Sequence, residues 1–371
     1  MKFTVKRDEL AEKLQAVLSV ISTRTTLPIL GNVLLNAEGE RLSLAATDLD
    51  MSITGHVPAR VAKPGVTTVP ARTLAEMVRE LADEDIHLTV TNNRMEIKSA
   101  HGVYRMSGLS ADEFPRLPGL PAGGGVAIPT DELRAMVQRT AYAVSSDETR
   151  PALNGVLWHA AGDVMHMVAT DGHRLARVTA SANRLSGLKD ELILPPKALS
   201  LVVKMVGEND SEVIVLFGEK NIVFRVGDIV ITSRLIEGPY PNYMQVIPKE
   251  NDKLLRVDAG TLAAAVRRVA VLSNTLTRQV RFSLSAAGIE LSATNQDVGG
   301  EARETVACHY EGDDLEIGYN AHYILDMLKN FDPGEVVFRF STSIAAALVH
   351  SADEAQKDKY LCLVMPLRLA D

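Results

Sequence analysis

The sequence predicts an α+β fold in which one domain is used three times. An Ala-Thr-Asp or Ala-Thr-Asn triplet recurs at intervals of 123 and 124 residues, beginning at Ala46, Ala169 and Ala293. A second marker keeps the same phase and precedes an amphipathic stretch, beginning at Val69, Leu194 and Ile317. The chain has 371 residues, more than one hydrophobic core usually supports. A period this long indicates repeated whole domains rather than a solenoid.

Each repeat opens with a helical pattern, because apolar residues recur every three or four positions in residues 10–21, 133–141 and 262–272. Asp8 and Thr130 are suited to the first turn or to a capping position. A second amphipathic stretch follows in each repeat, at residues 71–81, 196–206 and 320–330. We therefore expect two helices per domain.

The rest of each repeat alternates apolar and polar residues, as strands with one buried face do. Two such runs, residues 31–48 and 155–171, surround short turns that contain glycine and predict hairpins. Further alternating runs occupy residues 87–100, 212–235 and 335–351. Each domain is therefore predicted to pack its two helices on antiparallel sheets and to be itself a duplicated β-α-β-β-β unit.

Shifts in composition mark the domain boundaries. Residues 117–125 and 248–252 are rich in proline, glycine or charge and predict linkers, giving domains 1–121, 126–248 and 252–371. The glycines at 123–125 are followed by no Gly-Lys-Ser or Gly-Lys-Thr, so they indicate a linker rather than a phosphate-binding loop.

Composition excludes several classes of function. A net charge of −8 argues against a simple basic nucleic-acid binder, although a basic channel can lie inside an acidic shell. No apolar run approaches the roughly 20 residues of a membrane span, and the N-terminus lacks a secretory pattern, so we expect a cytoplasmic protein. Cys308 and Cys362, the two cysteines, lie in apolar runs and predict packed thiols rather than a disulfide or metal site.

With this three-fold repeat, the stretches LPILGNVLL (27–35), VATDGHRLA (168–176) and VMPLRL (364–369) make the chain resemble the bacterial DNA polymerase III beta subunit family, the beta sliding clamps. The resemblance runs from Met1 to Leu369. It implies three DNA-clamp domains per chain and a head-to-tail homodimer that closes a pseudo-six-fold ring. Helices would line a hole around duplex DNA, bound without regard to sequence, and neither catalytic site nor cofactor is implied.

The resemblance also implies a groove between the second and third domains for short peptides of the DNA polymerase III alpha subunit, the clamp loader and other proteins with a clamp-binding motif. Apolar side chains would form its floor, and polar ones would orient the peptide. Its predicted residues are Leu153, Thr170, Gly172, His173, Arg174, Leu175, Pro241, Val246, Asn320, Tyr323, Ile344, Val364, Met365, Pro366, Leu367 and Arg368. Two departures, Gln245 and Pro151-Ala152, stand where some members carry arginine and aromatic residues, so the preferred peptide stays open.

Helices that face phosphates should carry Lys and Arg with few acids. Residues 196–206 and 260–272 fit this pattern, whereas the other helices mix both charges, as ordinary solvated faces do. The predicted DNA-facing residues are Arg24, Arg72, Arg79, Lys197, Lys204, Arg267 and Arg268. The resemblance further implies a subunit contact in which strand 103–107 pairs with the partner's third domain. Tyr104 and Met106 would there face Val271 and Leu272.

Two alternatives remain open. Asp171 and His173 are close enough in sequence to suggest a hydrolase, but no nucleophile pattern accompanies them, and Asp-Gly is a common turn pair. A duplicated clamp that confers resistance to a clamp-directed inhibitor would have the same fold. The sequence does not separate this paralogue from a housekeeping copy.

Overall fold

The computed structural model describes residues 1–22, 26–82, 84–122, 124–181, 191–207, 210–296 and 299–369. By its contacts the chain forms two compact units. Unit 1 holds residues 1–133 and 197–235, and unit 2 holds residues 134–196 and 236–371. The division falls inside the predicted middle domain, so that helix α3 (Thr130–Thr140) starts in unit 1 and ends in unit 2.

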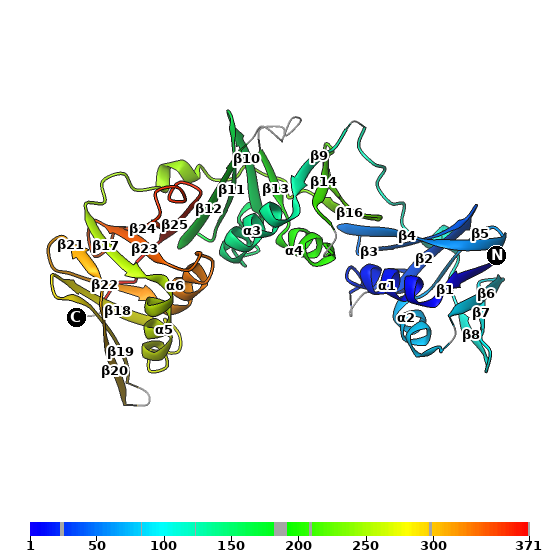
Figure 1. Cartoon of the computed structure of the whole chain (residues 1–371), viewed down its shortest axis with the longest axis horizontal. Helices are drawn as coiled ribbons and strands as arrows, with labels where there is room; N and C mark the ends of the chain where they lie inside the picture. The colour runs from blue at the N-terminus through cyan, green and yellow to red at the C-terminus, as the bar shows by residue number, and fades with distance from the viewer. Residues whose placement is uncertain are drawn as a thin grey trace. The chain divides into compact units, whose positions relative to one another are not determined.

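The element order contains the β-α-β-β-β motif six times, two per repeat, as predicted (Figure 1). The first motif is β1 (Lys2–Lys6), α1 (Arg7–Leu18), β2 (Asn32–Glu38), β3 (Arg41–Thr47) and β4 (Met51–Lys63). The second is β5 (Gly65–Pro70), α2 (Ala71–Glu80), β6 (Asp85–Thr91), β7 (Arg94–Lys98) and β8 (Val103–Ser107). Short 3-10 turns lie at Pro28–Gly31 and Ala111–Glu113.

The middle repeat begins with β9 (Val126–Pro129), α3, β10 (Val156–Ala161), β11 (Val164–Thr170) and β12 (Arg174–Ser181). It continues with β13 (Glu191–Leu194), α4 (Pro196–Met205), β14 (Glu212–Phe217), β15 (Asn221–Val226) and β16 (Ile229–Arg234). Among its described residues, 3-10 turns lie at Ala141–Ala143, Pro151–Asn154 and Tyr243–Val246.

The last repeat starts with β17 (Lys253–Asp258), α5 (Ala259–Ala270), β18 (Gln279–Ser285), β19 (Gly288–Asn295) and β20 (Gly300–Val306). After the short strand β21 (His309–Glu311) come β22 (Leu315–Asn320), α6 (Ala321–Leu328), β23 (Glu335–Phe340), β24 (Ala347–Ser351) and β25 (Tyr360–Val364). These elements confirm the predicted α+β class with three repeated two-helix domains.

Unit 1 is organised around one antiparallel sheet with the order β8-β7-β6-β1-β4-β16-β15-β14-β9. Strands β2, β3 and β5 extend it from β4, and α1 packs on α2 and on β4, as Figure 1 also shows. The residues that form the strands alternate in burial, which is the periodicity of a sheet with one covered face. In β7, for example, Met95 and Ile97 are fully buried between exposed or half-buried neighbours.

Unit 2 contains two antiparallel sheets, ordered β13-β10-β11-β12-β25-β24-β23-β17-β21 and β20-β19-β18-β22. Helix α5 packs on α6 and on β19 and β20. It begins where the Asp258 carboxylate accepts a hydrogen bond from the Thr261 backbone N–H at 2.7 Å, an N-cap that satisfies an otherwise free donor. The apolar face of α5 is buried and includes Leu262, Val266 and Val269.

Candidate peptide-binding groove

The loop that joins β11 to β12 is a tight turn organised by two side chains. The Thr170 hydroxyl donates to the Arg174 carbonyl at 2.7 Å and accepts from the Gly172 N–H at 3.1 Å. One Asp171 carboxylate oxygen accepts the backbone N–H groups of His173 and Arg174, at 2.8 and 2.9 Å. Gly172 has φ +92°, a left-handed conformation that glycine adopts without steric cost. The Asp-Gly pair therefore forms the turn that its sequence predicts.

The turn between β3 and β4 in unit 1 has the same internal bonds. The Thr47 hydroxyl donates to the Met51 carbonyl at 2.7 Å and accepts from the Leu49 N–H at 3.0 Å. The Asp48 carboxylate accepts the N–H groups of Asp50 and Met51, at 3.2 and 2.7 Å. Leu49, with φ +82°, stands where the other turn has Gly172. The repeated Thr-Asp pair thus encodes one backbone shape in two repeats.

Arg174 is the electrostatic centre of the turn in unit 2. Its guanidinium lies 3.1 Å from an Asp171 carboxylate oxygen and 2.9 Å from one of Asp326, and only 12% of its side chain is exposed. It also donates to the Tyr142 carbonyl at 2.7 Å and stacks 4.6 Å from the Tyr323 ring centroid. With so many partners, Arg174 is held in one orientation and orders the residues around it.

Apolar residues of the predicted groove lie in one cluster beneath this turn. Leu153 and Leu175 are buried together with Leu157, Val168, Ile193, Tyr240, Tyr243 and Leu363. Leu175 pairs with Leu363 across β12 and β25, and with Thr170 across β11 and β12. Pro241 and Val246 stand on the segment that carries the two buried tyrosines and are exposed. This arrangement offers an apolar floor with an exposed apolar border.

The C-terminal segment runs beside the same turn. The Met365 N–H donates to the His173 carbonyl at 2.8 Å, and the Leu367 N–H donates to the Gly318 carbonyl at 2.8 Å. A side chain at position 318 would begin 3.0 Å from the Leu367 carbonyl oxygen, so the glycine permits this close approach. Met365 is 37% exposed, although its neighbour in the chain, Val364, is buried. Met365 therefore lies against the predicted turn, and Leu367 lies against Gly318 of β22.

The remaining predicted groove residues occupy the adjoining surface of unit 2. The Asn320 side-chain oxygen caps α6 by accepting the His322 N–H at 2.9 Å, and Pro366 is half-buried. Ile344 and Arg368 are exposed. Backbone pairing or stacking thus connects Thr170, Arg174, Leu175 and Val364 with His173, Met365 and Tyr323. Ile344, Arg368, Pro241 and Val246 are placed by their position on the surface rather than by such contacts.

Apart from Asp171, the residues beside the groove were not predicted from the sequence. A pocket of about 360 Å³ is lined by His173, Arg174 and Tyr323 together with Ser145, Ser146, Asp147, Arg150 and Asp171. Hydrogen bonds from the Thr149 hydroxyl, the Arg150 guanidinium and the Thr149 N–H lower the pKa of Asp147 to about 2. Tyr142 and Asp326 contact Arg174 from 32 and 152 residues away, and polar residues at such separations carry no recognisable spacing.

The contacts of Asp171 oppose the hydrolase hypothesis. One of its carboxylate oxygens is bonded to backbone N–H groups of its own turn, and the other faces Arg174. The carboxylate therefore shapes the turn and neutralises Arg174. An acid-base role would need it to be directed toward a substrate or a nucleophile.

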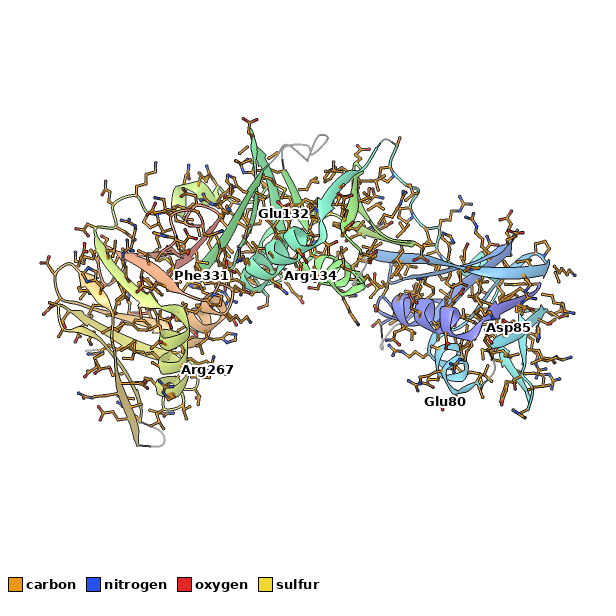
Figure 2. All side chains as sticks on the ribbon, viewed as in Figure 1. Glu80, Asp85, Glu132, Arg134, Arg267 and Phe331 are labelled. Atoms are coloured by element: carbon orange, nitrogen blue, oxygen red, sulfur yellow. The ribbon has the colours of Figure 1, made fainter. Side chains whose placement is uncertain are left out.

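The predicted DNA-facing residues that the structure describes are exposed on their helices, and several already have partners. Lys197 lies 2.6 Å from Asp48, and Arg79 lies 3.3 Å from Glu80. Arg268 makes a two-point ion pair with Glu304 on β20. Lys204 on α4 is exposed, as is Arg267 on α5 (Figure 2), whereas Arg72 donates to the Ile21 carbonyl at 3.2 Å. Arg24 lies outside the described residues.

The predicted subunit-contact residues lie on a strand at the end of a sheet in unit 1 and after helix α5 in unit 2. Strand β8 ends its sheet in unit 1, with Tyr104 and Met106 half-buried next to Ile97 and Met95 of β7. In unit 2, Val271 follows the last turn of α5 and is 77% exposed, while Leu272 is half-buried. Leu276, four residues after Leu272, is 90% exposed.

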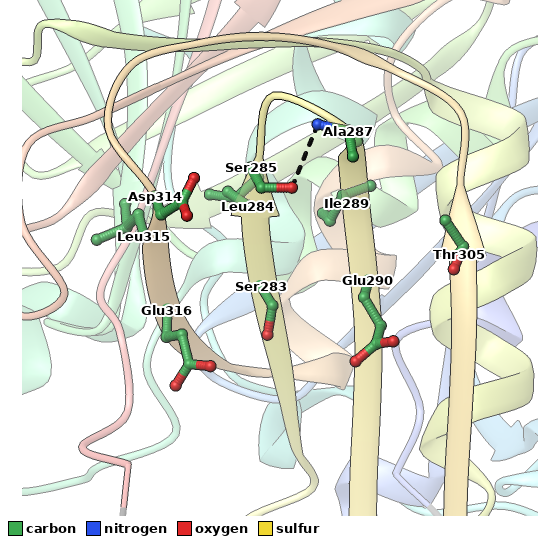
Figure 3. Close-up of a pocket in the computed structure, with 11 residues that line it drawn as sticks. Ser283, Leu284, Ser285, Ala287, Ile289, Glu290, Thr305, Asp314, Leu315 and Glu316 are labelled. Atoms are coloured by element: carbon green, nitrogen blue, oxygen red, sulfur yellow. Dashed lines mark hydrogen bonds between the residues drawn. The ribbon is translucent and has the colours of Figure 1, made fainter.

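Another pocket of unit 2 lies away from the predicted groove residues. A pocket of about 380 Å³ lies between the β18–β19 turn and β22, lined by Ser283, Ser285, Glu290, Glu316 and their neighbours (Figure 3). Its acidic side chains include Glu316, which forms an ion pair with Arg281 at 3.1 Å. Within the described ranges, no three His, Cys, Asp or Glu side chains are grouped to hold a metal ion. Among the helices of the described residues, none has the length and apolar character needed to cross a membrane.

Comparison with known proteins identifies the family. Models of the N-terminal, central and C-terminal domains of the DNA polymerase III beta subunit match residues 1–118, 127–242 and 244–368. The beta sliding clamps of Pseudomonas aeruginosa and Escherichia coli (strain K12) are 37% and 34% identical over 371 residues, with both chains fully covered.

Solved structures give the same result. The DNA polymerase III subunit beta of P. aeruginosa has a TM-score of 0.94 at 37% identity, with full coverage of both chains. The DNA polymerase sliding clamp of Bacillus subtilis has a TM-score of 0.94 at 29% identity, also with full coverage. Likeness of sequence and fold along the whole length shows that this chain belongs to the DNA polymerase III beta subunit family, the non-catalytic sliding clamps.

Proposed function

We propose that two copies of this chain close head to tail into a ring that encircles duplex DNA in the cytoplasm and tethers the replicative polymerase. The observation that carries the proposal is the full-length match to sliding clamps, with all three family domains in order. Six copies of one β-α-β-β-β motif per chain fit a ring in which the same motif repeats.

Two sheet ends support closure by a second copy. Strand β8 in unit 1 and strand β20 in unit 2 each end their sheet, and exposed edges are normally paired, covered or charged. Half-buried Tyr104 and Met106 continue the core layer of unit 1 up to its edge, whereas exposed Val271 offers apolar surface in unit 2. A contact between two different surfaces of identical chains is heterologous and can close into a ring.

DNA would be held by topology, with weak contacts that ignore base sequence. The chain has a net charge of −8, and several of its candidate DNA-facing cations are engaged by acids. After loading by a clamp loader, the ring should remain on circular duplex and slide off linear duplex with free ends. Equal loss from both substrates would contradict encirclement.

The groove would receive short segments of the DNA polymerase III alpha subunit, the clamp loader and other clamp-binding proteins. Its buried leucines supply an apolar floor, and the fixed Arg174 together with exposed His173 supplies polar contacts at its edge. A fluorescent peptide from the polymerase subunit should bind the native ring and be displaced by the unlabelled peptide. A peptide that binds equally well to a variant with Leu153 and Leu175 changed to Ala would place the groove elsewhere.

A further inference from the structure

The segment that carries Pro241 and Val246 is fixed to the sheet from one side. We call residues 240–247 the strap. Its side chains Tyr240 and Tyr243 are buried in the cluster that also holds the groove leucines, and Ile247 packs against that cluster. The strap contains the short 3-10 turn Tyr243–Val246, and the Gln245 N–H donates to the Asn242 carbonyl at 3.3 Å. The position of Tyr243 therefore controls the position of both exposed groove residues.

A polar row crosses the sheet next to this cluster. Residues directly opposite each other on adjacent strands place Glu191, His159, His166 and Thr179 side by side on β13, β10, β11 and β12. Because residues two apart on a strand share a face, Leu157 and Val168 of the groove cluster lie on the same face as this row. The row is thus the polar continuation of the groove floor.

Tyr243 connects the strap to this row. Its hydroxyl lies 2.9 Å from His159 Nδ1, and its ring packs edge-on against His159 and His166 at centroid distances of 5.9 and 6.4 Å. Burial raises the pKa of Tyr243, so its hydroxyl stays protonated and can donate a hydrogen bond to the imidazole nitrogen. This bond links the strap to the centre of the sheet.

His166 is a neighbour with a different partner. Its Nδ1 lies 3.0 Å from the Thr179 hydroxyl, so its bond stays within the sheet. Burial, with Arg177 and His159 nearby, lowers the pKa of His166 to about 4, which leaves its ring uncharged at neutral pH. The two histidines are opposite each other on adjacent strands, yet only His159 bonds to the strap. The bond between His166 and Thr179 is therefore a suitable control for the bond between His159 and Tyr243.

We propose that His159 is a positioning residue for the peptide groove: through the Tyr243 hydroxyl it holds the strap so that Pro241 and Val246 face the bound peptide. This rests on the proposed function, because it assigns a further residue to the same groove. His159 does not touch the peptide. It restricts the motion of the strap that contacts the peptide, and a strap that is already ordered loses less conformational entropy when the peptide binds.

The test measures the dissociation rate of a fluorescent polymerase-derived peptide from the full-length dimer. Tyr243→Phe removes the hydroxyl and keeps the buried ring, and His159→Leu removes the acceptor. Each should raise the dissociation rate about fivefold, the effect of losing one hydrogen bond of about 1 kcal/mol. The double variant should be no worse than the single ones, since both remove the same bond. His159→Asn, which offers a side-chain oxygen, should restore most of the native rate.

Thr179→Val is the matched control, because it removes the partner of His166 and leaves the strap bond intact. It should bind the peptide at the native rate. The proposal is overturned if Tyr243→Phe releases the peptide at the native rate, or if Thr179→Val raises the dissociation rate as much as Tyr243→Phe does.

Hydrogen exchange of residues 240–247 tests the strap without any peptide. Exchange should be faster in Tyr243→Phe than in the native protein and unchanged in Thr179→Val. Equal exchange in the two variants would refute the positioning role of His159. If the native dimer binds no peptide but the two variants differ in exchange as expected, the proposed groove is refuted, whereas the bond between His159 and the strap is supported.

Discussion

Arg174→Ala is the sharpest test of how the groove is built. The side chains of Arg174, Asp171 and Asp326 are 12%, 13% and 16% exposed, so the two ion pairs lie in a largely desolvated site. Removing one member of a buried ion pair leaves the charge of the other member unpaired, and it typically lowers the free energy of unfolding by about 3–5 kcal/mol. Asp326 keeps His322 and Lys329 nearby, at 3.3 Å each, which favours the lower end of that range.

We therefore expect Arg174→Ala to lower the free energy of unfolding of unit 2 by about 3 kcal/mol. For a region of roughly 200 residues this corresponds to a fall in melting temperature of about 6–12 °C, measured by calorimetry or circular dichroism. Lys329→Ala is the matched control, because Lys329 pairs with the same carboxylate but its side chain is 63% exposed. Exposed pairs contribute at most about 1 kcal/mol, so the control should change the melting temperature by no more than about 4 °C.

The effect should depend on pH with a definite sign. Burial raises the pKa of Asp326, but the hydrogen bond from Arg174 and the charges of His322 and Lys329 outweigh it and hold that pKa below its usual value. A carboxyl with a depressed pKa contributes stability that is present above its unfolded pKa and lost as pH falls through its folded pKa. The gap between native protein and Arg174→Ala should therefore be largest near neutral pH and shrink below about pH 4. Equal destabilisation by both variants, or a gap that widens in acid, would refute the reasoning.

Three further predictions concern assembly and binding. Val271→Ala with Leu272→Ala should open the dimer while the domains stay folded, because lost aliphatic contacts in an interface cost several kcal/mol; an unchanged mass at nanomolar concentration by light scattering would contradict this. Replacing four basic residues with Ala should weaken direct DNA binding and flatten its salt dependence by roughly one log-log unit per lost phosphate contact, the four being Lys197, Lys204, Arg267 and Arg268. Met365→Ala should weaken peptide binding by about thirtyfold and leave dimer mass unchanged, whereas native affinity would exclude Met365 from the groove.

The repeated architecture could be predicted because short segments of sequence specify its helices, strands and turns. The recurring Ala-Thr-Asp triplet and the amphipathic stretches that follow it predicted six helices and the doubled strand motif, and the element order confirms them. The Asp171-Gly172 turn was likewise predictable, since its bonds join residues within four positions of one another. Local rules of turn and helix formation suffice at this scale.

The network around the groove could not be predicted in the same way. The partners of Arg174 come from three different segments, and the strap reaches His159 across 84 residues of chain. Such contacts depend on how the sheets pack, which periodicity does not report. The groove residues Thr170, His173 and Met365 were placed by family resemblance, and their neighbours Arg150 and Asp326 were missed because that resemblance did not include them.

In the two turns that begin at Thr47 and Thr170, the residues that fix the backbone shape are not those that differ between the repeats. Both loops take their shape from the threonine hydroxyl and the aspartate carboxylate, which bond to the backbone of their own turn. The positions between and after them do not contribute side chains to those bonds, so Leu49 and Gly172, or Met51 and Arg174, can differ without altering the loop. The position after the turn, Met51 in one repeat and Arg174 in the other, can therefore differ between repeats, whereas positions 49 and 172 both have positive φ and favour glycine. Within one chain, the same backbone shape then carries Leu49 and Met51 in one repeat, and Gly172 and Arg174 of the proposed groove in another.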